Sequence, residues 1–511
     1  MSDSRTSKSI KNSSVALIFY AINLLLQFFS RKVFLEYLGN DILGLNTTAM
    51  NLLQFLNLAE LGISTAVGFT LYAPIAHKDK DTINEIITLQ GKLYKRIALM
   101  IIGGAIILMA FFPLIFGKIT LPLWYAYASF GVLLFSSLLG YFYNYRQVIL
   151  SASQQDYKIQ YSFKTVQLLK IVVQIFVIKY SSFPYLWWLI LEGGFAILSS
   201  MSLTWMTNRT FPWLKNINMP FKTLKKKYPE FTKKIKQLFI HKIGTFVLTQ
   251  SSPIIIYAYT SLATVTYYGN YLLIITGVQQ LMSAIFNSLT AGVGNLVVES
   301  NLKKIWEVFD ELFSIRFFIS SVICFTIYQI TPYFIRAWIG SEYVMSNITL
   351  VLMVITLFIN LTRYTVETFI NAYGLYQDVF APAIEAALNI GLSIIFGYLW
   401  GLNGILLGVV VSLVVIVLFW KPYFLFTRAL KGFLKLYIAI YLKHLLIFII
   451  SGCFCQYIIS SFINLTDNTW CNVAIMLFVT LLLSGLTLLI GMIVSHCGII
   501  RLRYRIKGLK K

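Results

Sequence analysis

Ionisable side chains occur inside stretches of the sequence that are otherwise apolar. Residues 51–72 read NLLQFLNLAELGISTAVGFTLY, with Glu60 near the middle. A single helix of this length, at about 1.5 Å per residue, would be long enough to cross the hydrocarbon of a bilayer. On that helix Asn57, Glu60, Ser64 and Gly68 would share one face. A carboxylate at this depth is costly unless it has partners or a water-filled cavity, so the stripe indicates a functional site.

Comparable polar stripes mark other apolar segments, and their charged members are mostly cations. Segment 13–36 carries Arg31, segment 159–180 carries Lys164 and segment 238–260 carries Lys242. Cations with fewer carboxylates on inward faces suit a large anionic ligand, because arginine and lysine bind phosphate while amides bind hydroxyl groups. We therefore expect a substrate-binding cavity rather than a catalytic, cofactor or metal site. Its expected residues are Arg31, Asn57, Glu60, Lys164, Lys242, Arg363, Glu367 and Glu385.

These charges also have a purely structural interpretation. Arg363 and Glu367 are four residues apart, which is the spacing of an ion pair within one helix. Glu60 could instead pair with Arg31 or Lys32, since buried pairs can serve the specificity of packing alone. The sequence leaves the structural and the ligand-binding role open for each of them.

Other polar residues in apolar segments are interpreted as structural. Lys170 is expected to extend its charge toward the membrane surface, and Glu192 has no evident partner. Five cysteines and four histidines lie scattered without the spacing of metal ligands. The cysteines are therefore expected to be buried thiols that act as small apolar side chains.

The composition places most of the chain in a membrane. Apolar residues make up 58% of the 511 positions and charged residues 12%, against about 25% charged in a typical soluble domain. The apolar segments do not alternate with polar residues as barrel strands do. We expect an all-α polytopic membrane protein with about 14 transmembrane helices, at approximately 13–36, 44–73, 94–116, 121–149, 159–180, 184–206, 238–260, 266–296, 311–335, 345–372, 379–400, 402–424, 436–460 and 470–496.

Lysine and arginine residues are concentrated in alternate connections, as expected when basic loops stay in the cytoplasm. With both termini inside, the cytoplasmic connections hold the dense basic run at 222–236, and the tail RLRYRIKGLKK is also inside. The net charge of +23 then follows from topology and from anionic lipid headgroups, without nucleic acid. The stretch FKTLKKKYPEFTKKIKQLF is interpreted either as an amphipathic helix on the cytoplasmic leaflet or as a solvated basic linker.

Internal repetition predicts two pseudo-symmetric halves. The stretch SASQQDY ends one apolar segment, and NAYGLYQD ends another segment that occupies the corresponding place in the second half. Two six-helix blocks in the same orientation are parallel repeats, with a substrate site between them near the midplane. The expected domains are an N-terminal six-helix lobe at 1–206, a basic cytoplasmic linker at 207–237, a C-terminal six-helix lobe at 238–424, and two additional helices with a basic tail at 425–511.

Four stretches resemble one family of transporters. They are LAELGISTAVGFTLYAPIAHKDKDTINEI, NSLTAGVGNLVVES, INAYGLYQD and APAIEAALNIGLSIIFGYLWGLNGILLG. In their order along residues 10–425 they are similar to the polysaccharide flippases of the multidrug, oligosaccharidyl-lipid and polysaccharide exporter superfamily. The chain departs from the family pattern at Ser252 and Pro253, where relatives often have an acidic residue, and at Val379 and Phe380, where basic residues are common. We therefore transfer no ion-coupling or headgroup role to these positions.

The resemblance implies two lobes around a central cavity, with transport by alternating access. It also implies the cargo, an undecaprenyl-pyrophosphate-linked oligosaccharide repeat unit that crosses the bacterial cytoplasmic membrane for surface polysaccharide synthesis. Lipid-linked oligosaccharide and membrane lipids are then the expected partners. Proton or sodium coupling and a polysaccharide polymerase partner fit the same pathway.

Three other functions are weighed against this one. A lipid II or teichoic-acid precursor flippase has the same ligand chemistry and is not separated by the sequence. A multidrug antiporter fits less well, because inward cations repel organic cations. A membrane-embedded polymerase or transferase would need large external loops, whereas the longest expected external connection is residues 336–346. The sequence also has no evident catalytic triad or acidic metal cluster, so no enzymatic activity is expected.

Overall fold

In the part of the chain that it describes, the computed structural model contains helices and no strands, which confirms the expected all-α class. Nine helices in this part are long and apolar enough to cross a membrane. Two of them, Lys11–Leu56 and Phe380–Arg428, each extend over more than one expected segment, so the number of about 14 spans stays a prediction. The described residues are 5–60, 62–117, 121–229, 251–288, 293, 296–297, 301–375, 378, 380–462, 470–495 and 497–498.

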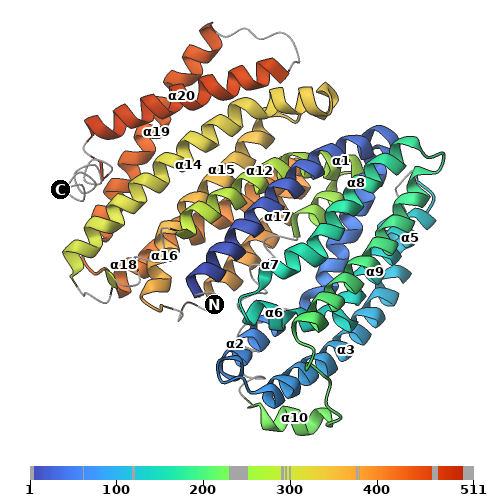
Figure 1. Ribbon diagram of the computed structural model, residues 1–511. Coiled ribbons are helices and arrows are strands. Elements are labelled where there is room, and N and C mark those ends of the chain that lie inside the picture. Colours follow the sequence, from blue (N-terminus) through green and yellow to red (C-terminus); the bar gives the residue numbers. More distant parts are fainter. Residues whose placement is uncertain are drawn as a thin grey trace. The chain divides into compact units, whose positions relative to one another are not determined.

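The chain divides into two compact units, Met1–Thr266 and Tyr267–Lys511, which are described separately. Unit 1 is built on long helices that pack side by side (Figure 1). Helix α1 contacts α5 and α8, and α9 packs on the same two helices. Leu45 of α1 and Phe130 of α5 are buried in one apolar cluster, which also contains Phe112 just after α3. These helices are α1 (Arg5–Leu56), α3 (Lys80–Ala110), α5 (Trp124–Phe142), α8 (Thr165–Tyr180) and α9 (Pro184–Thr210).

Shorter elements connect the long helices of unit 1. They mark places where the regular α-helix changes pitch or ends, and two of them carry expected site residues. These elements are η1 (Asn57–Glu60), α2 (Ile63–Ala76), α4 (Phe112–Ile115), η2 (Asn144–Gln147), α6 (Val148–Ala152), α7 (Asp156–Ile159) and the π-helix η3 (Gln160–Lys164).

Helix α3 begins well before the segment expected for it at 94–116. Its N-cap residue is Asp79, whose carboxylate accepts a hydrogen bond from the Thr82 backbone N–H at 3.0 Å. Hydrogen bonding from Thr82 lowers the pKa of the Asp79 carboxyl, because it favours the charged form. Because α3 begins this early, its first turns provide a surface on which the segment after α9 can pack.

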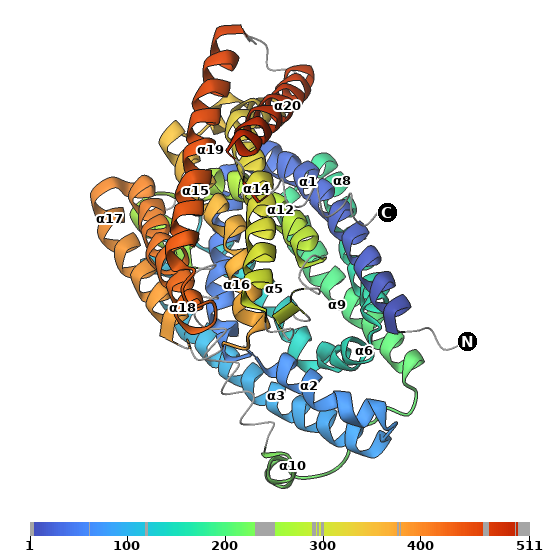
Figure 2. The ribbon, with the colours of Figure 1, turned by 90° about the vertical axis from the view of Figure 1, so that its left-hand side faces the viewer.

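That segment, residues 211–229, forms a strap along α3. The backbone N–H groups of Lys215 and Ile217 donate to the side chains of Asn84 and Thr88 at 3.0 and 2.9 Å. The strap includes the short helix α10 (Phe221–Lys227), which lies against α3 (Figure 2). Leu224 of α10 is completely buried in the same apolar cluster as the early residues of α3.

Glu85 of α3 fastens the end of the strap. It accepts a hydrogen bond from the Tyr228 hydroxyl at 2.5 Å and lies 2.6 Å from the ammonium of Lys227. Burial raises the pKa of Tyr228 above its ordinary value. The apolar side of α10 packs on α3. Its interpretation as an amphipathic helix on the cytoplasmic leaflet stays a prediction. The rest of that stretch, from residue 230 on, lies outside the described residues.

Unit 2 is organised around the long helix α14 (Leu302–Trp338), which contacts α15 (Asn347–Thr362) and α20 (Trp470–Val494). Helix α20 runs beside α14 in Figure 1. Phe325, Cys455 and Met476 belong to a buried cluster that joins α14 to the two C-terminal helices. The remaining elements are α12 (Leu262–Ser288), within which the division between the units falls, η4 (Ser341–Tyr343), α16 (Tyr364–Ala372), α17 (Phe380–Leu413), the π-helix η5 (Val414–Trp420), α18 (Lys421–Arg428) and α19 (Leu434–Phe462).

The cysteines fit the structural interpretation only in part. Cys324, Cys455 and Cys497 are buried, as expected, whereas Cys453 and Cys471 are exposed on the surface of the chain. Helices α19 and α20 have apolar outer surfaces, so an exposed thiol there needs no polar partner.

Helix α17 contains a reversal of chain direction at Trp400 and Gly401. Gly401 has φ 57° and ψ −134°, which only glycine adopts readily. The two arms then approach very closely: a Cβ on Gly404 would lie 1.9 Å from the carbonyl oxygen of Phe396. This is the close approach that small residues permit between membrane helices. The reversal confirms the boundary that the sequence predicts between segments 379–400 and 402–424.

Candidate functional site

Glu60 lies at a break between two helices. Helix α1 ends at Leu56, the 3-10 turn η1 follows, and α2 begins at Ile63. Gly62 between them has φ 91°, a left-handed conformation that costs other residues about 1–2 kcal/mol. The expected continuous helix over residues 51–72 is therefore wrong, and with it the single helical face. Irregular backbone at membrane depth is tolerated where it lines a cavity or is buried in protein.

The break opens onto a polar cavity of about 190 Å³ inside unit 1. The Tyr94 hydroxyl donates to Glu60 Oε1 at 2.8 Å, and the Tyr141 hydroxyl donates to Asn57 Oδ1 at 3.0 Å. Asn57 and Glu60 thus line the same cavity, and the broken backbone, not a helix face, brings them together. The cavity is lined by Asn57, Glu60, Ser64, Gln90, Tyr94, Ser137, Gly140, Tyr141, Tyr145 and Gln147.

The two expected cations of unit 1 that the structure describes, Arg31 and Lys164, do not line this cavity. Arg31 Nη2 donates to the Thr266 carbonyl oxygen at 3.3 Å, and the expected pairing of Glu60 with Arg31 or Lys32 is replaced by its bond from Tyr94. Lys164 is exposed at the end of the π-helix η3. Lys242 lies outside the described residues.

A buried ion pair joins α8 and α9 where the sequence suggests none. Lys170 Nζ lies 2.7 Å from Glu192 Oε1, with 13% and 14% of the two side chains exposed. Gln174 donates to the other carboxylate oxygen at 3.1 Å. The interpretation of Lys170 as extending to the membrane surface is therefore wrong, and Glu192 does have a partner. Sequence reasoning missed the pair because its members lie on different segments.

In unit 2, the expected residues Arg363 and Glu367 belong to a larger cluster. Arg363 Nη2 lies 2.7 Å from Glu367 Oε1, and Arg363 Nη1 donates to Asn360 at 3.2 Å. The ammonium of Lys421, at the start of α18, contacts the same carboxylate oxygen of Glu367. The structural pair suggested by the spacing is thus present. Lys421 was not among the expected site residues, because in the sequence it stands near the end of an apolar segment.

Glu385 lies on α17 and is 2% exposed. Its Oε1 atom has no hydrogen-bond partner in the described part of the chain. The positive charges of Arg363 and Lys421 act on this carboxylate through space. The structure therefore places Arg363, Glu367 and Glu385 in one electrostatic environment, with Lys421 as the additional cation.

Arg316 is a further buried cation that the expected set omits. This side chain of α14 is 1% exposed. It donates to Thr368 Oγ1 at 3.1 Å and to the Phe286 carbonyl oxygen at 3.0 Å, near the C-terminal end of α12. A cation at that end is favourable, because helix carbonyls there carry partial negative charge. Its position inside the apolar segment 311–335 was the available sequence signal.

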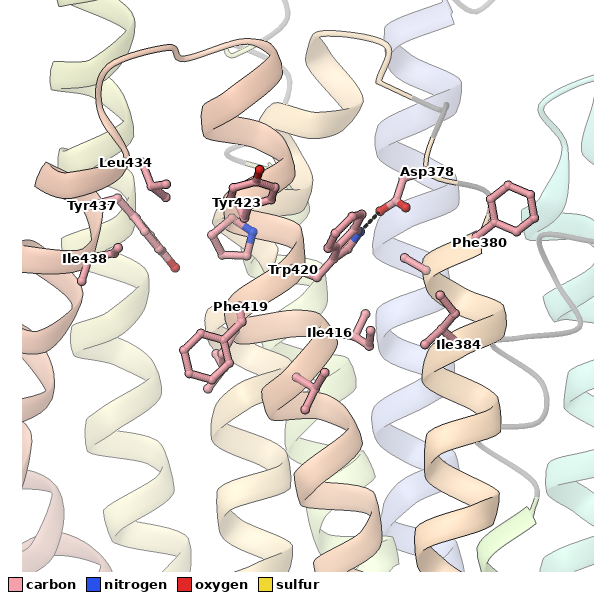
Figure 3. Close-up of a pocket in the computed structure, with 14 residues that line it drawn as sticks. Asp378, Phe380, Ile384, Ile416, Phe419, Trp420, Tyr423, Leu434, Tyr437 and Ile438 are labelled. Carbon is pink, nitrogen blue, oxygen red and sulfur yellow. Dashed lines mark hydrogen bonds between the residues drawn. The ribbon is translucent and has the colours of Figure 1, made fainter.

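Unit 2 also contains apolar pockets. The helices α17 and α18, which carry Glu385 and Lys421, line one of them in part. This pocket has a volume of about 530 Å³ and is lined mainly by aliphatic and aromatic side chains of α17, η5 and α19 (Figure 3). At its rim the Trp420 indole donates to Asp378 Oδ2 at 2.9 Å. A second pocket of about 480 Å³ shares Phe419 and Tyr437 with the first. Together they offer hydrocarbon-like surface of the kind that an acyl or isoprenoid chain would contact.

Comparison with solved structures gives several likenesses, of which two have TM-scores above 0.5. The lipid II flippase MurJ in an inward closed conformation matches with a TM-score of 0.66 and 16% identity, over 94% of this chain and 98% of that chain. An inward-facing multidrug resistance MATE family transporter of the MOP superfamily matches with a TM-score of 0.56 and 14% identity, over 81% of this chain and 97% of that chain. No protein-family model and no curated protein matches the sequence.

At these identities the likenesses show the fold. The chain has the transporter fold shared by the lipid II flippase and the MATE transporter, a fold of helices that span a membrane. This agrees with the resemblance found in the sequence, which pointed to the same superfamily.

Proposed function

We propose that the chain is a flippase that moves undecaprenyl-pyrophosphate-linked oligosaccharide across the bacterial cytoplasmic membrane by alternating access. The observation that carries the proposal is the agreement in fold with a lipid II flippase over almost the entire chain. The sequence resemblance to polysaccharide flippases supports the choice of cargo. The concentration of lysine and arginine in alternate connections of the sequence supports cytoplasmic termini.

Buried cations support an anionic headgroup as cargo. Moving an unpaired charge into hydrocarbon costs several kcal/mol or more, so a pyrophosphate needs compensating groups along its path. Arg363 and Lys421 share the carboxylate of Glu367, and each cation has more N–H donors than these contacts use. A phosphate oxygen can therefore add to the cluster without first breaking it. Arg31 supplies a further guanidinium in unit 1.

Apolar pockets support a cargo that carries a lipid. The pocket in Figure 3 has Phe419, Trp420 and Tyr437 among its lining residues, with the carboxylate of Asp378 at the rim. A polyprenyl chain placed there would bury apolar surface, which favours binding by roughly 25 cal/mol per Å². The headgroup and the tail would thus have chemically separate binding surfaces.

The decisive experiment is reconstitution into vesicles with a fluorescent polyprenyl-pyrophosphate oligosaccharide, followed by quenching of the label on the outer leaflet. We expect flipping by the wild-type protein and at least a tenfold loss in Arg31→Ala and in Arg363→Gln. The matched control is Arg336→Gln, which removes an exposed arginine and should flip normally. Normal flipping by both single variants and by the double variant would reject the cationic site.

A second candidate cargo is a lipid II or teichoic-acid precursor, which the likeness to a lipid II flippase favours. The same vesicle assay distinguishes the two cargoes, because the polyprenyl pyrophosphate of the labelled lipid is kept and the attached sugar is replaced. Faster flipping of the peptide-bearing precursor than of the oligosaccharide would assign the chain to that cargo. A multidrug antiporter would instead move an organic cation and leave both glycolipids in place.

A further inference from the structure

The strap and the early part of α3 carry exposed basic side chains that the proposed function does not use. They come from two segments far apart in the sequence, which meet where α10 packs on α3 (Figure 2). We call this group the basic patch, and its members, all exposed, are Arg96, Lys222, Lys225 and Lys226. We propose that the basic patch binds the phosphate groups of anionic phospholipids in the cytoplasmic leaflet. The proposal concerns unit 1 alone and does not depend on the cargo.

The packing of α10 determines which of its sides is free. Leu224 is completely buried in the apolar cluster beside α3, and Glu85 of α3 holds the end of the helix. Held in this way, α10 leaves Lys222, Lys225 and Lys226 exposed. None of these three lysines forms an ion pair with a carboxylate in the part of the chain that the structure describes. Like charges three and four residues apart on a helix repel one another, so a bound anion would relieve an unfavourable interaction.

Arg96 of α3 adds a guanidinium to these lysines. Its Cζ atom lies 3.8 Å from the centroid of the Phe221 ring, at the start of α10. Stacking on a ring fixes the plane of the guanidinium, and its N–H donors remain at the edges of that plane. An arginine held in this way is preorganised for paired hydrogen bonds to a phosphate, while lysines add point charges. The basic patch thus combines the two kinds of side chain that bind phosphate.

The exposure of side chains along α3 indicates that Arg96 lies at the membrane surface. Helix α3 is long and apolar enough to cross a membrane. Leu99 and Met100, about one turn after Arg96, are 65% and 61% exposed. Large apolar side chains with this exposure on a spanning helix face acyl chains. An exposed arginine directly before them then lies at the level of the lipid headgroups, where basic side chains are favoured.

Helix α9 gives an independent indication of the same level. Trp205 is 57% exposed, and the Arg209 guanidinium lies 5.2 Å from its ring centroid. Exposed tryptophan is typical of the interface between membrane and water. Helix α9 ends at Thr210, and the strap begins at the next residue. The strap therefore starts beside the interface, and the contact of Phe221 with Arg96 brings the start of α10 to the interface as well.

The proposed contact with the membrane is electrostatic. The apolar side of α10 packs on α3, so the helix would meet the leaflet with its basic side and would not insert into it. Basic side chains near an anionic surface are attracted over a distance of about 8 Å at physiological salt. Binding should therefore depend on the charge of the lipid and weaken as salt is added.

The test is native mass spectrometry of the purified full chain in detergent, with phosphatidylglycerol or phosphatidylcholine added at equal concentration. We expect the wild type to retain more phosphatidylglycerol than phosphatidylcholine. Replacement of the three patch lysines should reduce this excess about fivefold, since each basic side chain adds to the attraction. This variant is Lys222→Gln/Lys225→Gln/Lys226→Gln. The matched control removes the same number of exposed lysines from unit 2 and should keep most of the excess; it is Lys303→Gln/Lys431→Gln/Lys435→Gln.

Digestion with trypsin reports on the patch directly, because trypsin cleaves after lysine. The full chain is placed in nanodiscs of phosphatidylcholine alone or of phosphatidylcholine and phosphatidylglycerol in equal parts. Cleavage after the three patch lysines should be slower in the mixed nanodiscs. Sodium chloride at about 1 M, where the Debye length is about 3 Å, should remove this protection.

Three results would each overturn the proposal. They are equal retention of the two lipids by the wild type, an equal loss in the patch variant and the control variant, and equal cleavage rates in the two kinds of nanodisc. Protection that persists at high salt would also contradict an electrostatic contact. The assays contain no glycolipid, so a failure of flipping would leave this proposal intact, and the reverse also holds.

Discussion

Replacement of Gly404 by alanine should destabilise the protein through a single methyl group. Gly404 lies just after the reversal of α17, where its arm packs directly on the preceding arm. The added Cβ would lie 1.9 Å from the carbonyl oxygen of Phe396 and 3.1 Å from the backbone nitrogen of Gly397, whereas ordinary contacts begin at 3.4 Å. Both neighbours are backbone atoms, so no side-chain rotation can relieve the clash.

The size of the effect follows from this geometry. The two arms must separate by more than 1 Å, and insertion of atoms into a packed core costs about 1–3 kcal/mol. We expect the upper end of that range, because separation also weakens the contact between Ser393 Oγ and the Ile405 carbonyl oxygen at 3.0 Å. Gly408 is expected to behave in the same way, since a Cβ there would meet the backbone nitrogen of Ser393 at 2.5 Å.

The measurement is the apparent unfolding temperature of purified variants in one detergent. Gly391→Ala is the matched control, because it lies in the same helix and its Cβ would meet nothing within 4 Å. Alanine is favoured over glycine within a helix by about 0.5–1 kcal/mol, so this control should be unchanged or more stable. The two substitutions therefore have opposite expected signs. If Gly404→Ala proved as stable as Gly391→Ala, the close packing of the two arms would be refuted.

Three further predictions concern other features. Gly62→Ala should lower the unfolding temperature, because the φ of 91° at the break costs alanine about 1–2 kcal/mol; equal stability would contradict a left-handed conformation. Glu192→Gln should destabilise the protein by up to about 3–5 kcal/mol, since it leaves the buried Lys170 ammonium without a carboxylate, and adding Lys170→Met should recover much of the loss in the same unfolding assay. Glu85→Gln should release the strap, measured as faster limited proteolysis within residues 211–229, and an unchanged cleavage rate would show that the Glu85 contacts are not needed to hold it.

Much of the architecture could be predicted from local sequence. The low content of charged residues and the long apolar segments determine an all-helical membrane protein, because only regular helices satisfy their backbone groups within a segment. The boundary at Gly401 was also predictable, since glycine between two apolar stretches permits a reversal. The resemblance in four stretches pointed to the superfamily whose fold the solved structures share.

The candidate site was only partly predictable. From periodicity alone, residues 51–72 are predicted to form one helix. Periodicity does not show that Gly62 adopts a left-handed conformation, which divides this segment. Asn57 and Glu60 were identified by their residue types, but Tyr94 and Gln90, which complete the cavity, lie on another helix. Lys421 was missed because it stands near the end of its apolar segment, and Arg316 was missed because its partner Thr368 lies on another helix.

The sequence by itself determined which segments are apolar and which of them carry charge, because hydropathy and residue type are local properties of the chain. Only the tertiary structure decided which charges meet. Lys170 with Glu192 and Lys421 with Glu367 are contacts between helices, and whether two side chains touch depends on how the helices rotate and pack. The same reason explains why a glutamate expected in the middle of a helix lies instead beside a cavity.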